Sequence, residues 1–201
     1  YKRQVITSTD ERLSADVVVL AIPPPALDAL LPNHWTAPDL AWAPIVGVNL
    51  WYDRMVFQGD MLAAIVDGEA MWLFNRTAIL GQSGPEQHVA VSISAAEAVM
   101  DVPRAELASA VAAKIARALP AAGQARVLRS SVEKVRSATF VPAPGSATRR
   151  PSAVTPLANT FLAGSWTATG WPDTMESAVR SGHTAARLAQ DFRTQSAGSI
   201  A

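Results

Sequence analysis

The sequence predicts a mixed fold: α/β overall, with an α+β character in the middle third, where an antiparallel sheet is expected. Strand-like and helix-like segments interleave in the first and last thirds of the chain, as in a layered α/β sheet. The middle third instead carries short alternating strands bounded by turn residues, which is typical of antiparallel sheets. Two amphipathic helical segments, 103–119 and 174–192, are long enough to flank these sheets.

The first third begins with a short β-rich segment at 4–8. The apolar run 15–22 follows, and its continuous β-branched residues suit a strand buried on both faces in a parallel sheet. Three prolines at 23–25 end this strand, so we expect a short helix at 26–31. Residues 32–44 are expected to form a loop.

The middle third is expected to form an antiparallel sheet with one covered face. In the strand 45–52, side chains at even positions share one face and Trp51 lies on the other, because alternate residues of a strand point to opposite sides. Further strands are expected at 61–66 and 71–75, joined by a hairpin turn at 67–69, and at 88–94.

The helix at 103–119 starts after Pro103 and places Leu107, Val111 and Ile115 on one face. The remaining elements expected are an extended segment at 127–140, a Pro-rich loop at 141–156, a strand at 161–163, the helix at 174–192 and a frayed tail at 194–201. The two ends are expected to share one layer. Residues 1–31 and 157–193 would then form one domain, and residues 32–156 a second.

Composition excludes several classes of function. The 17 basic residues equal the 17 acidic ones, so no positive field favours nucleic acid. The absence of cysteine excludes disulfides and thiolate chemistry, and three histidines without ligand spacing predict no metal site. No apolar run is long enough to span a bilayer. Arg149 and Arg150, in the Pro-rich loop, are expected to be solvated, with contact to a lipid headgroup or pyrophosphate as the alternative.

The most informative segment is 161–183, which reads as a strand, a tight Gly/Trp/Pro turn and a helix. The first N–H groups of a helix have no helical partner and carry about half a positive charge. Asp173 or Thr174 can cap one of them, which leaves the amides near Met175 and Glu176 free to face an electron-rich ligand.

The small residues of this segment fit the same hypothesis. Gly164 and Gly170 let the backbone approach a ring system. One helix face is expected to pack closely on a sheet through Ala178, Gly182, Ala185 and Ala189. The alternative is an ordinary strand-turn-helix that ends a domain, with small residues that serve packing only.

Residues 162–182 resemble the flavin-contacting motif of the flavin-containing amine oxidase and carotenoid desaturase superfamily. They follow its order of Ala-Gly, x-Thr, Gly-x-Pro, Met-Glu-x-Ala and Ser-Gly. Residues 16–25 resemble the strand before its proline turn, and 44–54 the first strand of its substrate domain. The resemblance implies the C-terminal part of a FAD-dependent fold, with remnants of the FAD-domain sheet and a mostly antiparallel substrate-domain sheet flanked by helices.

By this resemblance the FAD cofactor is contacted by Gly164, Ser165, Gly170, Trp171, Thr174 and Met175. Two departures matter. The superfamily's N-terminal Gly-rich turn is absent from the chain, so a missing FAD-binding half of the same enzyme is expected as its partner. Ser165 stands where the superfamily has Asp or Glu, and a serine accepts a weaker hydrogen bond from the ribityl chain because charge assistance is lost.

Four pieces narrow the resemblance to the squalene-associated branch, the hydroxysqualene dehydroxylases of bacterial hopanoid synthesis: residues 50–54, 71–76, 136–140 and 166–172. This branch implies a polyprenyl lipid substrate and a cytoplasmic enzyme in peripheral contact with the inner membrane. Side chains that could line an apolar tunnel are Val48, Leu50, Trp51, Met71, Trp72 and Phe74, with ordinary sheet core as the alternative. A carotenoid desaturase, an amine oxidase and a non-enzymatic lipid- or partner-binding module remain open.

Overall fold

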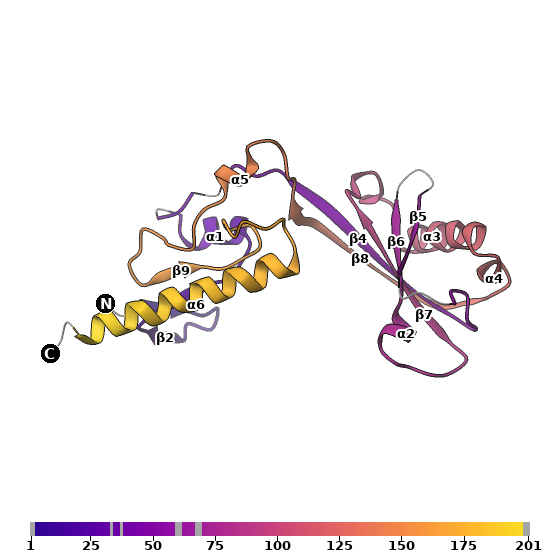
Figure 1. The fold of residues 1–201 in the computed structure, drawn as a ribbon, viewed down its shortest axis with the longest axis horizontal. Coiled ribbons are helices and arrows are strands. Elements are labelled where there is room, and N and C mark those ends of the chain that lie inside the picture. The colour runs from indigo at the N-terminus through magenta and orange to yellow at the C-terminus, as the bar shows by residue number, and fades with distance from the viewer. Residues whose placement is uncertain (1–2, 33, 37, 59–61, 67–69, 199–201) are drawn as a thin grey trace. The chain divides into compact units, whose positions relative to one another are not determined.

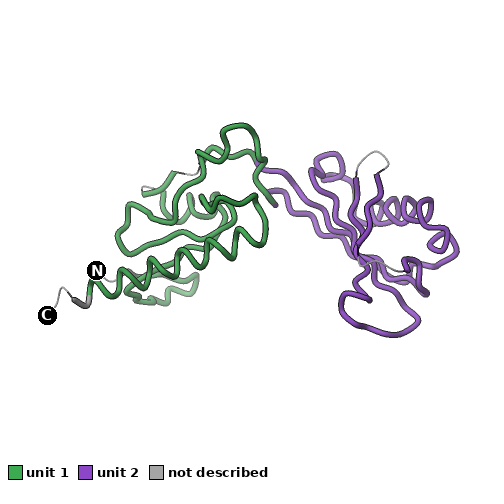
Figure 2. Tube along the Cα trace, in the orientation of Figure 1, with its two compact units in different colours: residues 1–41, 139–201 green, residues 42–138 purple. Residues whose placement is uncertain are grey.

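The computed structural model describes residues 3–32, 34–36, 38–58, 62–66 and 70–198 (Figure 1). The chain divides into two compact units, one formed by residues 1–41 and 139–201 and the other by residues 42–138 (Figure 2). The mixed α/β class predicted from the sequence is confirmed. Residues 32–41 and 139–156, expected in the middle domain, lie in the unit of the chain ends. The assignment of one unit to FAD and the other to substrate stays a prediction.

The unit of the chain ends contains two small sheets. Strands β1 (Arg3–Ile6) and β2 (Arg12–Ala15) pair antiparallel, whereas β3 (Val18–Leu20) pairs parallel with β9 (Thr160–Leu162). The run 15–22 was expected to be one strand buried on both faces. In the structure Ala15 ends β2, Val18–Leu20 form β3, and Val19 is 43% exposed, so this run is divided between two sheets and is not buried on both faces. The expected short helix is present as α1 (Pro24–Leu30), but it begins within the proline run, two residues before the expected start at 26.

The long helix α6 (Met175–Gly198) packs on β9 through Ala185, with Phe161 and Ala163 on the strand side. The predicted small-residue face is partly wrong, because Ala178 is exposed and the buried positions of the first turns are Ser177 and Ser181. The helix also continues through 194–198, where a frayed tail was expected, and residues 199–201 lie outside the described chain.

The loop expected at 141–156 contains a short helix, α5 (Ser146–Arg149), which follows a left-handed Gly145. Ser146 is buried, whereas the residues on either side of it, 145 and 147–149, are exposed. Among the described residues, every helix is too short or too polar to cross a bilayer.

The second unit is a five-stranded sheet with strand order β5-β6-β7-β4-β8. Its strands are β4 (Trp42–Tyr52), β5 (Leu62–Ile65), β6 (Met71–Asn75), β7 (Gln87–Ser94) and β8 (Val127–Phe140). The predicted hairpin pairs β5 with β6, but its turn at 67–69 lies outside the described residues. The register places Asn49 opposite Ala90, and Trp72 opposite Ser92.

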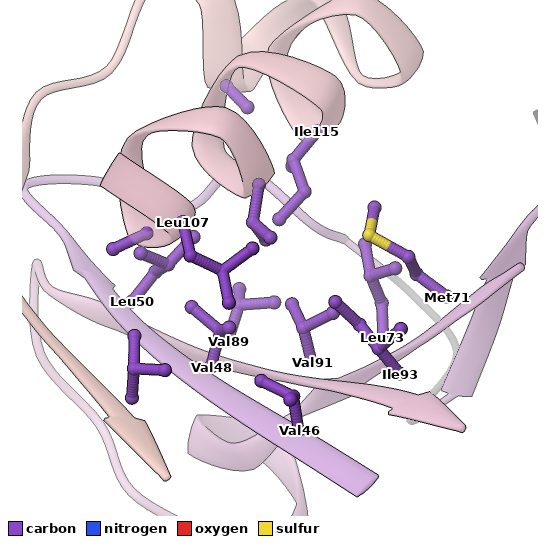
Figure 3. Close-up of a cluster of buried hydrophobic side chains, with 14 of the residues drawn as sticks. Val46, Val48, Leu50, Met71, Leu73, Val89, Val91, Ile93, Leu107 and Ile115 are labelled. Atoms are coloured by element: carbon purple, nitrogen blue, oxygen red, sulfur yellow. The ribbon is translucent and has the colours of Figure 1, made fainter. Parts of the chain in front are cut away.

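Helix α3 (Arg104–Ala118) covers one face of this sheet. Figure 3 shows side chains of β4, β6 and β7 pointing toward the helix residues Leu107 and Ile115. The even-numbered residues of β4 from 46 to 52 are almost fully buried, as their alternation predicts. The short elements α2 (Arg76–Ile79), η1 (Glu97–Val99) and α4 (Pro120–Gly123) complete the unit.

Candidate functional site

The turn between β9 and α6 is held in place by its own polar groups. The Gly164 N–H donates to Ser181 Oγ at 2.8 Å, and Thr167 returns two hydrogen bonds to the Gly164 carbonyl, from its N–H at 3.0 Å and its hydroxyl at 2.9 Å. Ala168 N–H donates to the Pro151 carbonyl at 2.8 Å. The turn is therefore fixed both to the helix behind it and to the segment that precedes β9.

Thr174 caps α6. Its hydroxyl accepts from the Ser177 N–H at 3.2 Å, and its carbonyl accepts from the Ala178 N–H at 3.1 Å. Asp173, the other capping candidate, instead accepts from the Phe140 N–H at 2.6 Å. The cap thus uses a neutral hydroxyl, and the acidic side chain of the first turn is Glu176.

The start of α6 is open. In the described part of the chain, no acceptor meets the N–H groups of Met175 and Glu176, and the Met175 residue is 88% exposed. The Glu176 carboxylate is engaged by Arg180 Nε at 2.7 Å. Two free amides at a positive helix end can therefore donate hydrogen bonds to an electron-rich ligand.

The two glycines of the turn differ in role. A Cβ added to Gly164 would lie 2.3 Å from Nε1 of Trp166, so the chain's own indole is enough to require a glycine here. Contact of Gly164 with FAD stays a prediction. Gly170 has φ +76° and open space around a would-be Cβ, so its glycine is required by backbone conformation alone.

Arg150 is the residue that sequence reasoning missed. Its Nη1 donates to the Trp171 carbonyl at 2.6 Å, and its Nη2 donates to the Ser165 carbonyl at 2.7 Å. The hydroxyls of Thr169 and Ser177 lie at 3.1 and 3.3 Å from Nη2. Burial lowers the pKa of the Arg150 guanidinium, but arginine keeps its charge in proteins. The expectation that this side chain is solvated is wrong; its neighbour Arg149 is exposed.

The remaining predicted flavin contacts lie around this network. The Ser165 residue is half-buried, and its carbonyl also accepts from the Ser177 hydroxyl at 3.0 Å. The Trp171 ring is 43% exposed and lies 4.4 Å from the Arg180 guanidinium. Ser165, Gly170, Trp171, Thr174 and Met175 thus lie on one turn and the start of the helix that follows it, and their contact with FAD stays a prediction.

The six predicted substrate residues divide between the two faces of the five-stranded sheet. Val48, Leu50 and Met71 are buried in the core beneath α3, where they cannot line a tunnel, and this corrects their assignment (Figure 3). Trp72 alternates to the other face and is 47% exposed. Phe74 and Trp51 share that face and are partly exposed, so these three keep the predicted role.

A stacked cluster lies on the same face of the sheet. The Trp51 and His88 rings stack at 4.2 Å, the Arg129 guanidinium lies 3.9 Å from the Trp51 ring, and His88 Nε2 is 2.8 Å from Asn49 Oδ1. Burial, and then the charges of Arg76 and Arg129, lower the pKa of His88. The cluster borders a pocket of about 600 Å³. Elsewhere too, the described residues include no group of three or more His, Asp or Glu side chains placed to hold a metal ion.

The sequence profile of one family, described as flavin containing amine oxidoreductase, matches residues 2–189. The chain belongs to this family. The family's flavin is consistent with the start of α6, because two unpaired N–H groups suit the carbonyl edge of a flat, electron-accepting ring.

Three relatives illustrate the similarity. The chain is 35% identical over 174 residues to a hydroxysqualene dehydroxylase of Sinorhizobium fredii, and 28% identical over 199 residues to a zeta-carotene desaturase of Arabidopsis thaliana. These alignments cover 87% and 86% of this chain but only 38% and 36% of the relatives. The solved cyclohexylamine oxidase of Brevibacterium oxydans matches with TM-score 0.63 at 15% identity, over 93% of this chain and 45% of that one. The chain therefore spans less than half the length of each of these three proteins.

Proposed function

We propose that this chain supplies the flavin-contacting turn and the substrate sheet of a FAD-dependent oxidoreductase that removes the hydroxyl group of hydroxysqualene to give squalene. The observation that carries the proposal is the identity of 35% to a hydroxysqualene dehydroxylase across most of the chain, against 28% to a carotene desaturase. The free amides at the start of α6 support the flavin part of the proposal independently of any relative.

In the proposed reaction a C–O bond breaks, a C–H bond forms and the hydroxyl leaves as water after gaining a proton. Reduced FAD, when bound, supplies the hydride, and an external two-electron donor restores it. The amides of Met175 and Glu176 would donate to the electron-rich edge of the ring, with the dipole of α6 favouring its reduced form. Trp72 and Phe74 would give the lipid chain an apolar surface on the open face of the sheet.

The proposed function implies two partners, a second, FAD-binding half of the enzyme and the membrane that contains the substrate. The FAD pyrophosphate would be held by a Gly-rich half of the same enzyme, because residues 1–201 contain no such turn. A polyprenyl substrate is membrane-dissolved, so the enzyme would meet the inner membrane from its cytoplasmic side as a peripheral protein.

The test is to express residues 1–201 together with the coding sequence that precedes Tyr1, and to record flavin absorbance of the purified protein. The protein is then incubated with reduced flavin and hydroxysqualene, and squalene is measured. A colourless protein that stays free of FAD when FAD is added refutes the enzyme proposal and leaves a lipid- or partner-binding module. A FAD-loaded protein that ignores hydroxysqualene and desaturates zeta-carotene instead places the chain with the carotenoid desaturases.

A further inference from the structure

The Arg150 guanidinium joins parts of the turn that the backbone alone leaves apart. Its two terminal nitrogens reach the carbonyls of Ser165 and Trp171, which lie at opposite ends of the turn. A planar fork with donors in fixed directions can hold two carbonyls at one separation, which a single ammonium cannot do.

The same guanidinium also reaches the helix that follows the turn. Nη2 lies 3.3 Å from Ser177 Oγ, and the Ser177 N–H is the group that Thr174 caps. The Ser177 and Thr169 hydroxyls are 2.5 Å apart, and Ser177 is completely buried. Arg150 and the helix cap therefore converge on one residue in the first turn of α6, directly after the open amides of Met175 and Glu176.

We propose that Arg150 is a positioning residue for the cofactor: it fixes the turn 165–171 against the start of α6 and so sets the direction of the two free amides. This inference rests on the proposed function, since it assigns the flavin as the ligand of those amides. Arg150 itself need not touch the flavin. Its bonds all go to the chain, and its effect on the cofactor passes through the backbone it holds.

The site offers a matched control. Arg149 precedes Arg150 in the chain, ends α5 and is exposed, so Arg149→Met removes the same charge without touching the network. Arg150→Lys keeps the charge and loses the fork, whereas Arg150→Met removes both at similar side-chain length.

The experiment uses the protein that includes the sequence preceding Tyr1. FAD affinity is measured by quenching of flavin fluorescence, and the absorbance and visible circular dichroism of the bound flavin report its surroundings. Hydrogen exchange of residues 164–178 is followed in the same samples. We expect FAD affinity to fall about tenfold in Arg150→Lys and about a hundredfold in Arg150→Met, because hydrogen bonds to a charged group are lost and the amides they orient become mobile. The flavin spectrum should shift and exchange should rise within 164–178, while Arg149→Met behaves as the wild type.

Each result decides the matter. If FAD affinity and flavin spectrum in both Arg150 variants match those of Arg149→Met, the inference is overturned, whatever happens to exchange. If exchange within 164–178 is unchanged while affinity falls, Arg150 acts on FAD by another route and the positioning role is wrong. If the wild type and the Arg149 control both fail to bind FAD, the proposed function itself is refuted, and this outcome differs from the others because no variant is needed to see it.

Discussion

The substitution Gly164→Ala measures how closely Trp166 packs over the turn. An added Cβ would lie 2.3 Å from Nε1 and 2.7 Å from Cδ1 of the Trp166 indole, which is well inside normal contact at about 3.5 Å. The indole has little room to retreat, because it is buried and its ring centroid lies 6.0 Å from that of Trp35 in an edge-on pair. The clash falls on rigid atoms of a packed ring.

The expected cost follows from two contributions. Overpacking of a filled site costs about 1–3 kcal/mol. The φ of +154° at Gly164 adds about 1–3 kcal/mol for a residue with a Cβ. We therefore expect the free energy of unfolding to fall by about 2–6 kcal/mol, a large part of the stability of an ordinary domain.

The assay is urea unfolding followed by far-UV circular dichroism, in a double-mutant cycle with Trp166→Leu. A smaller, flexible side chain can turn away from the new Cβ, so Gly164→Ala should cost about 1–3 kcal/mol less in the Trp166→Leu background than in the wild type. A loss below about 0.5 kcal/mol for the single substitution, or an equal loss in both backgrounds, refutes the reasoning that the indole is what demands glycine.

Three further predictions concern the second unit. Burial raises the pKa of Tyr52 to about 12, and its hydroxyl has no hydrogen-bond partner among the described residues. Tyr52→Phe should therefore stabilise the chain by about 1 kcal/mol. It should also remove a loss of stability that begins near pH 10, where the tyrosine of the unfolded chain ionises first; urea unfolding at a series of pH values measures both effects. The pKa of His88 is lowered in the fold, so this histidine is protonated first in the unfolded chain as pH falls below about 6.5, and stability is lost there. Thermal melts of His88→Gln at a series of pH values should lack this loss. The control variant His183→Gln should keep it. Gln87 is fully buried; its side chain accepts hydrogen bonds from the Val56 and Phe57 N–H groups and donates one to the Phe57 carbonyl. Gln87→Leu should therefore lower the free energy of unfolding, measured in urea, by about 3 kcal/mol. An unchanged urea midpoint would contradict the role of this side chain.

The elements of the second unit were largely predictable because each has one covered face. Alternation in 45–52 correctly gives the buried even positions, and the spacing of Leu107, Val111 and Ile115 correctly gives the face of α3 that meets the sheet. What alternation could not decide is whether a covered face meets a ligand or a helix. Leu50 and Met71 were assigned to a lipid for this reason, and they lie under α3 instead.

The polar core of the first unit could not be predicted from local pattern. Ser177 and Ser181 take the buried positions on α6 because the Ser165 carbonyl and the Gly164 N–H satisfy their hydroxyls, and these partners lie more than ten residues away in the chain. Arg150 was misjudged for the same reason. A charged residue in a loop rich in Pro and Gly is usually solvated, and only the tertiary arrangement of the turn supplies the carbonyls that hold it inside.

In the second unit, a lipid could contact the five-stranded sheet only on its open face, the face opposite α3. Its opposite face is filled by α3, so a substrate that touches this sheet must do so on the face that presents Trp72 and Phe74. Leu62 and Trp72 are each 47% exposed there. Leu62 lies opposite Phe74 in the β5–β6 pair, diagonal to Trp72, so this part of the face leaves apolar surface in water. At one end of that face, Trp51 lies with Arg129 and His88 in a polar cluster. Under the proposed function, the hydrocarbon of the substrate would lie over Leu62, Trp72 and Phe74, and its hydroxyl group would lie toward the cluster of Trp51, His88 and Arg129.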